Sequence, residues 1–163
     1  MSTPFLDAAY TRVDFDRELV FKFFVVFSLF ECALKRGGFC TKGRQGEALP
    51  NWEDFANNIH PQFSTLNDPE LLTAVNYMLK FPVKRQIPNN GTLIFVPMPR
   101  RLKLNDTAWL SILIRGVRNN LFHGGKWEFD PTRDPQLLNH SLTILEVWAR
   151  LSPNVEIELI NVQ

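Results

Sequence analysis

Apolar side chains recur every three or four positions in several stretches of this chain, a spacing that places them on one face of an α-helix. The strongest stretch runs from Asp14 to Arg36, with Asp14 or Asp16 available to cap its start and two glycines after its end. Its phenylalanines occupy most of the helix circumference rather than a single stripe. The pattern predicts a long central helix that is covered by neighbours on several sides.

The same spacing, combined with capping residues and prolines, predicts further helices. They cover residues Asn51–Ile59, Asp68–Leu79, Asn105–Phe122 and Asp134–Leu151. Asn51 can cap the first of them, and Asp68-Pro69-Glu70 is a typical capped beginning with proline at the first helical position. Asn105 or Asp106 can cap the third, whose end is expected at His123 and the two glycines after it.

The segments between these helices lack a helical period. Gly37–Pro50 is rich in glycine and charge and is predicted to be an exposed loop. Phe81–Pro99 contains four prolines and an Asn-Asn-Gly turn, which predicts an irregular connection in which Thr92–Val96 can form a short extended piece. The tail Val155–Gln163 alternates apolar and polar residues, as a short strand would.

Together these elements predict a single all-α domain over residues 1–163, an up-and-down helical bundle with a proline-rich connection and room for a short C-terminal strand. With 163 residues and 45% hydrophobic side chains, the chain can bury its own core. The apolar run Phe23–Phe30 is far shorter than the roughly 20 residues that cross a bilayer. Met1–Tyr10 lacks the features of a secretion signal, so we expect a cytoplasmic protein with no membrane partner.

Charge and cysteine content narrow the chemistry. The chain has 18 Lys and Arg and 17 Asp and Glu, so any contact with a nucleic acid would have to be local. Cys32 and Cys40 are too few for a disulfide framework, and no Cys/His cluster offers the ligands of a structural zinc. We therefore expect reduced thiols, no metal and no cofactor.

A group of polar residues stands at the end of the predicted 105–122 helix: Arg115, Arg118, Asn119 and His123. Asn119 and His123 are four residues apart, so the amide can hydrogen-bond the imidazole and set its tautomer, while Arg118 lies about 140° around the helix from His123. The helix dipole favours an imidazolium at this end, and the planar fork of an arginine suits a phosphate. These residue types are typical of a site that cleaves a phosphodiester.

An arginine followed a few residues later by a histidine is a short motif that also arises by chance. Arg133 and His140 form a second pair of this kind, but Arg133 precedes a predicted helix start, so we discount that pair. His60 and His140 are assigned structural roles.

The run Arg118-Asn119-Asn120-Leu121-Phe122-His123 resembles the signature of HEPN domains, a family of helical nucleases. The flanking residues 114–117 and 124–126 are similar to stretches of its bacterial members, and Glu31-Cys32-Ala33-Leu34-Lys35-Arg36 resembles a second family feature. The resemblance implies a metal-independent endoribonuclease of toxin or anti-phage defence type. In such an enzyme the ribose 2′-hydroxyl attacks the adjacent phosphate, leaving a 2′,3′-cyclic phosphate and a 5′-hydroxyl.

The resemblance also implies roles for individual residues. His123 would act as general acid or base, Arg118 would neutralise the phosphate, and Asn119 would orient one of its oxygens. Supporting and substrate-binding roles would fall to Glu31, Lys35, Arg115, Asn120, Lys126 and Trp127.

Some of these roles have ordinary alternatives. Glu31 and Lys35 lie one helical turn apart and could reach the cleft, with Glu31 holding Arg118, or they could form a solvated pair on the helix surface. Trp127 and Phe129 could stack an unpaired base or pack in the core.

The implied partners are RNA and a second copy of the chain. Because cleavage needs both an acid and a base, the two motif helices would face each other in a homodimer and supply two histidines. A toxin of this type can also have a cognate antitoxin protein. The alternative function is a HEPN-like module that binds a nucleotide, an RNA or a partner protein without cleaving, and a purely structural adaptor would bind no RNA at any salt concentration.

Overall fold

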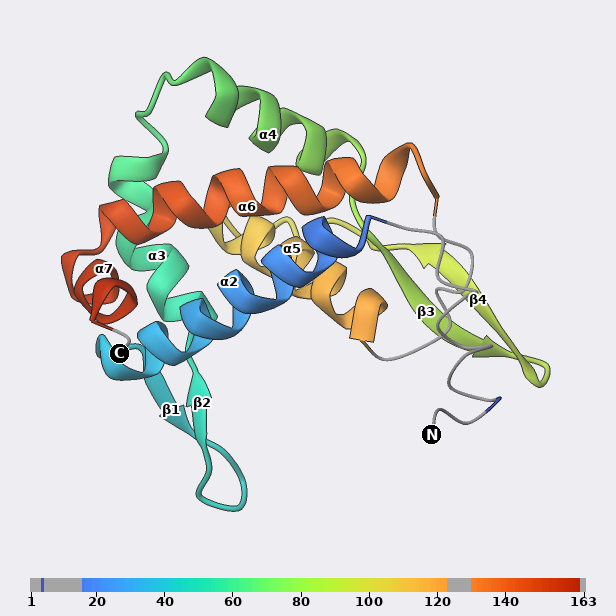
Figure 1. The fold of residues 1–163 in the computed structure, drawn as a ribbon, viewed down its shortest axis with the longest axis horizontal. Coiled ribbons are helices and arrows are strands. Elements are labelled where there is room, and N and C mark those ends of the chain that lie inside the picture. Colours follow the sequence, from blue (N-terminus) through green and yellow to red (C-terminus); the bar gives the residue numbers. More distant parts are fainter. Residues whose placement is uncertain (1–3, 5–15, 123–129, 162–163) are drawn as a thin grey trace.

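The computed structural model describes residue 4, residues 16–122 and residues 130–161. Within these ranges the chain forms six helices and two β-hairpins (Figure 1). In chain order they are α2 (Arg17–Arg36), β1 (Cys40–Lys42), β2 (Ala48–Pro50), α3 (Trp52–Phe63), α4 (Pro69–Lys80), β3 (Lys84–Asn89), β4 (Thr92–Pro97), α5 (Asp106–Phe122), α6 (Arg133–Leu151) and α7 (Pro153–Ile160).

The predicted helices are present, and side-chain caps set several of their starts. The carboxylate of Asp16 accepts a hydrogen bond from Leu19 N at 3.0 Å and begins α2, whereas Asp14 lies outside the described residues. Asn51 caps α3, which continues beyond the predicted end to Phe63. Asp68 caps α4 with proline at its first position, and Asn105 Oδ1 accepts from Ala108 N at 2.8 Å at the start of α5.

The core is an aromatic cluster between α2, α3 and α6. Figure 1 shows α6 running across the middle of the molecule, with α2 crossing it and α4 lying along it. Trp148 of α6 is fully buried, and its ring meets Phe55 and Phe63 of α3 edge-on at centroid distances of 6.0 and 5.8 Å. The buried face of α2, with Phe23, Phe27 and Phe30, covers the other side. The predicted long helix is therefore confirmed, but the expectation that its whole apolar circumference is covered is wrong, because Phe21 is 66% and Phe24 45% exposed.

The prediction of an all-α domain is wrong, because two antiparallel hairpins make the structure mixed α and β. The first hairpin, β1–β2, lies within the predicted loop Gly37–Pro50. Its turn closes through Gly43 N, which donates to Glu47 O at 2.8 Å, with Gly46 at a φ of 89°. Nearly all its side chains are exposed, so no apolar alternation could have indicated strands.

The second hairpin corrects the prediction of an irregular proline-rich connection. The extended piece expected at Thr92–Val96 is confirmed as β4, and it pairs with β3. Asn90 and Gly91, with φ angles of 46° and 80°, form the two-residue turn, for which an Asn-Gly pair is suited. A two-stranded ribbon tolerates the prolines of β3 and β4 because each strand has an open edge.

The predicted C-terminal strand is also wrong, because α7 occupies this segment. Pro153 takes the first helical position, and Val155 and Leu159 lie four residues apart on one face of the helix. Val155 is fully buried, and α7 packs against α2 and α6, whereas Ile157 is 53% exposed. Packing against α2 and α6 therefore favours a helix, although the apolar residues of this segment also alternate as they would in a strand.

The base of the β3–β4 hairpin is fastened to α5 and α6. Arg133 Nη2 donates to Pro82 O at 2.8 Å, and Asn120 Nδ2 donates to Lys84 O at 2.7 Å. Between them Val83 is buried against Gly116, the point where α5 carries no side chain. These contacts fix where the hairpin leaves the helical body.

No helix within the described ranges is both long enough and apolar enough to span a bilayer.

Replacing Gly116 with Ala is expected to destabilise the fold, although alanine is the better helix former by about 1 kcal/mol. A Cβ here would lie 2.6 Å from Cγ1 of the buried Val83. We expect the free energy of unfolding in a urea titration to fall by about 1–3 kcal/mol. Val83→Ala removes the atom that this Cβ would meet. The double variant should therefore lose less free energy of unfolding than the two single variants lose together, and strictly additive losses would contradict the close packing.

His140 is expected to make stability depend on pH. Its ring lies 4.7 Å from that of Tyr77, and burial lowers the pKa of His140 from its usual value of 6.5. The unfolded chain therefore binds the proton more readily than the folded chain does. The contribution of His140 to the free energy of unfolding is present above pH 6.5 and is lost as the pH falls below this value. In urea titrations at several pH values, His140→Gln should lose less stability on acidification than the wild type, and identical profiles would refute this assignment.

Candidate active site on α5

The last turns of α5 present polar residues on the side of the helix that faces away from the core. Leu113 and Ile114 are fully buried and Val117 is 5% exposed, so this apolar face fixes the orientation of the helix. Arg115 and Asn119 are exposed. The sequence prediction that the core side anchors α5 while its polar residues cluster outside is confirmed for these residues.

Arg118 is half-buried and has contacts on two sides. Its Nη1 donates to Asn119 Oδ1 at 3.2 Å, and its guanidinium carbon lies 6.0 Å from the centre of the Phe27 ring of α2. A guanidinium over an aromatic face gains cation–π attraction while its edge stays available for hydrogen bonds. The end of α5 and the middle of α2 therefore meet at Arg118.

The other half of the predicted motif lies outside the described residues. This applies to His123, to the glycines at 124 and 125, and to Lys126, Trp127 and Phe129. The expected hydrogen bond between Asn119 and the His123 imidazole therefore stays a prediction. Asn119 is described with a different partner, the guanidinium of Arg118.

Glu31 has a partner that the sequence did not indicate. Its Oε1 accepts a hydrogen bond from Trp52 Nε1 of α3 at 3.0 Å, in a partly buried position. Glu31 lies one turn after Phe27, so its carboxylate is on the side of α2 that receives Arg118. The described ion pairs include neither a Glu31–Arg118 nor a Glu31–Lys35 bridge. The hydrogen bond between Trp52 and Glu31 therefore holds α3 against α2.

Asn120 faces a different surface from its neighbour Asn119. Its amide donates to Lys84 O, so Asn120 positions the β3–β4 hairpin. This contact brings the exposed side chains of Lys84 and Arg85 to the end of α5, although the motif search did not select either residue. A signal for them existed in the sequence, because Leu71–Asn105 contains six Lys and Arg and no Asp or Glu.

The remaining histidines have structural surroundings. His60 Nδ1 lies 2.8 Å from Thr107 Oγ1 of α5, and His140 packs against Tyr77. In the second arginine–histidine pair, Arg133 donates to the carbonyl of Pro82, whereas His140 packs against the ring of Tyr77. The structural roles assigned to these residues agree with these contacts.

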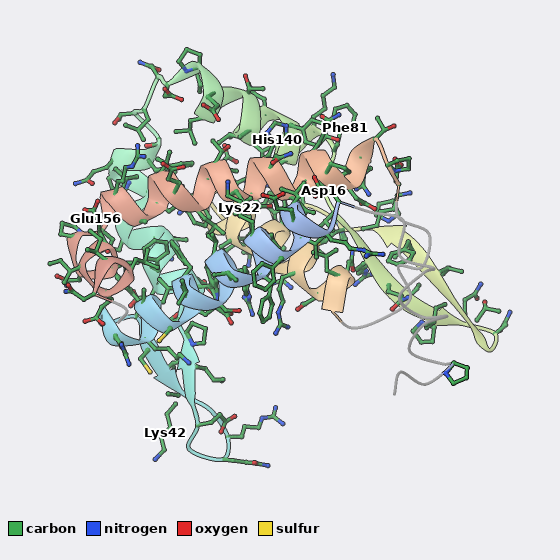
Figure 2. All side chains as sticks on the ribbon, in the orientation of Figure 1. Asp16, Lys22, Lys42, Phe81, His140 and Glu156 are labelled. Carbon is green, nitrogen blue, oxygen red and sulfur yellow. The ribbon has the colours of Figure 1, made fainter. Side chains whose placement is uncertain are left out.

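The other chemistry-bearing features lie elsewhere. A cavity of about 630 Å³ between α2, α4, α6 and α7 has no lining residue from α5. Its apolar lining is interrupted by polar and charged residues: Lys22, which Figure 2 labels on α2, Glu70, Asn139, Thr143 and Glu146. Cys32 and Cys40 are free thiols. Across residues 16–122 and 130–161, no three His, Cys, Asp or Glu side chains gather as metal ligands, and metal independence stays a prediction.

Comparisons of this chain with protein-family models, with curated proteins and with solved structures give no match. The HEPN resemblance therefore rests on the motif residues and on the order of the helices along the chain.

Glu31→Ala is expected to lower the free energy of unfolding by about 1–2 kcal/mol, because it removes the acceptor of Trp52 Nε1. Glu31→Gln keeps an oxygen acceptor and should lose clearly less. Urea titration followed by tryptophan fluorescence measures both variants. If Glu31→Ala were as stable as the wild type, Glu31 would have no anchoring role.

Proposed function

We propose that this chain is a metal-independent endoribonuclease of the HEPN type, acting in the cytoplasm as a toxin or an anti-phage defence effector. The observation that carries the proposal is the contact between Arg118 and Asn119 on the outer side of α5, at 3.2 Å. His123 follows four residues after Asn119 in the sequence. A guanidinium, an amide and an imidazole are the groups that transfer of a phosphate to the 2′-hydroxyl would use.

In the proposed reaction the 2′-oxygen of a ribose forms a bond to the adjacent phosphorus while the bond from phosphorus to the 5′-oxygen breaks. A base accepts the proton of the 2′-hydroxyl, and an acid gives a proton to the leaving 5′-oxygen. Arg118 neutralises the phosphate oxygens as charge builds up, and Asn119 orients one of them. His123 serves as one of the two proton-transfer groups.

The second proton-transfer group would come from a second copy of the chain. In the proposed homodimer the two α5 helices face each other, and each contributes Arg118 and His123 to a shared cleft. The exposed Arg115 would lie at the edge of this cleft and hold a flanking phosphate. A cognate antitoxin that covers the cleft would keep the enzyme inactive.

Purified protein is expected to cut an unstructured RNA in the presence of a chelator and to leave 2′,3′-cyclic phosphate ends. His123→Ala should lower the cleavage rate by roughly 10²–10⁴-fold, because proton transfer is lost. Arg118→Ala should lower it by roughly 10²–10³-fold, because the charge on the phosphate is no longer neutralised. Denaturing gels give the rates, and mass spectrometry identifies the ends.

Arg44→Ala is the matched control, since Arg44 is an exposed arginine in the turn between β1 and β2. This variant should cleave at the wild-type rate, and circular dichroism should show that all variants keep their helices. Full activity of His123→Ala would overturn the proposal. Binding without cleavage by the wild type would instead identify a binding module.

Sedimentation should give about twice the chain mass of 18.9 kDa, and a fully active monomer would exclude paired histidines.

A further inference from the structure

The outer face of α5 is bordered on two sides by other elements. On one side Arg118 lies over Phe27 of α2, and on the other Asn120 donates to Lys84 O of β3. Successive helical residues are about 100° apart, so Arg115 and Asn119 lie on the arc between these two borders. Both are exposed. An extended ligand on Arg118 could therefore pass over Arg115 and Asn119 and reach the base of the β3–β4 hairpin.

Positive charge is concentrated in the part of the chain that contains this path. From Leu71 to Phe122 the chain has eight Lys and Arg but a single acidic residue, Asp106, and Asp106 is paired with Arg100 at 2.7 Å. The other 16 of the 17 acidic residues lie outside this stretch. The net charge of +1 therefore conceals a strongly cationic part and an acidic remainder.

The base of the hairpin also has a fixed position. Arg133 holds Pro82 O, Val83 packs against Gly116, and Asn120 holds Lys84 O, so three consecutive residues are fastened to the helices. Lys84 is the last of these three residues, and Arg85 follows it. The side chains of both are exposed. Successive strand residues point to opposite faces, which puts one cation on each face of the ribbon. Because the backbone that carries these cations is held in place, binding there orders only the side chains and loses less conformational entropy.

We infer that the β3–β4 hairpin is a substrate-binding arm for single-stranded RNA, with Lys84 and Arg85 holding phosphates next to those held at Arg115. The inference rests on the proposed function for the identity of the ligand. A single strand suits this surface because its phosphates follow an extended path and are bound without base recognition. Asn120 then acts as a positioning residue that holds the arm against α5.

The test is the affinity of a fluorescently labelled single-stranded RNA, measured by anisotropy at several salt concentrations. Lys84→Ala/Arg85→Ala should weaken binding roughly tenfold and reduce the slope of log affinity against log salt by about 1.4, the value for two phosphate contacts to a single strand. Lys42→Ala/Arg44→Ala is the matched control, because it removes the same charge from the exposed β1–β2 hairpin, on which Figure 2 labels Lys42. This control should retain the affinity and slope of the wild type.

Cleavage assays separate failure of the arm from failure of the proposed function. In the hairpin variant the RNA concentration that gives half-maximal cleavage should rise roughly tenfold, since the two side chains hold the substrate. A wild type that binds RNA without cutting it, together with a weakened hairpin variant, would refute the nuclease and support the arm. Equal binding by the hairpin variant and the wild type, an equal loss in the control variant, or a wild type that binds no RNA would overturn the arm.

Discussion

The packing of Trp52 against α2 fixes the surroundings of the candidate site. Its ring stacks on Phe27 and Phe30 at centroid distances of 5.5 and 5.4 Å, and its Nε1 donates to Glu31. Stacking and a hydrogen bond to a carboxylate together set the angle of α3 on α2. Because α3 also packs along α5, the ring of Phe27 that receives Arg118 is held in place by a third helix.

Three consecutive residues of the motif at the end of α5 contact three different parts of the structure. Asn119 contacts Arg118 on the outer face, Asn120 holds β3, and Leu121 packs against the core. Adjacent helical residues point in directions about 100° apart, so residues that are contiguous in sequence are divided among different neighbours. A run that resembles a catalytic signature therefore also contains the residue that places the hairpin.

The distribution of charge links the fold to the proposed chemistry. A net charge of +1 attracts no polyanion from a distance, but the hydrogen bond from Asn120 to Lys84 O places the first residues of β3, with their cations, beside the end of α5. The acidic residues lie mostly on other elements, although Asp134 of α6 lies close to Val83 and Asn120 at the base of the hairpin. This distribution would allow the proposed binding of RNA at one surface without a general affinity for nucleic acid.

The sequence predicts five of the six described helices, because period and caps are local: Asp16, Asn51, Asp68 and Asn105 begin helices close to where they were expected. It also determined the polar cluster on the outer side of α5. Tertiary contacts were needed to show that exposed, proline-containing strands pair, that the tail is helical, and that Glu31 accepts a hydrogen bond from a tryptophan 21 residues away. These outcomes depend on contacts between residues distant in the chain, which no local pattern encodes.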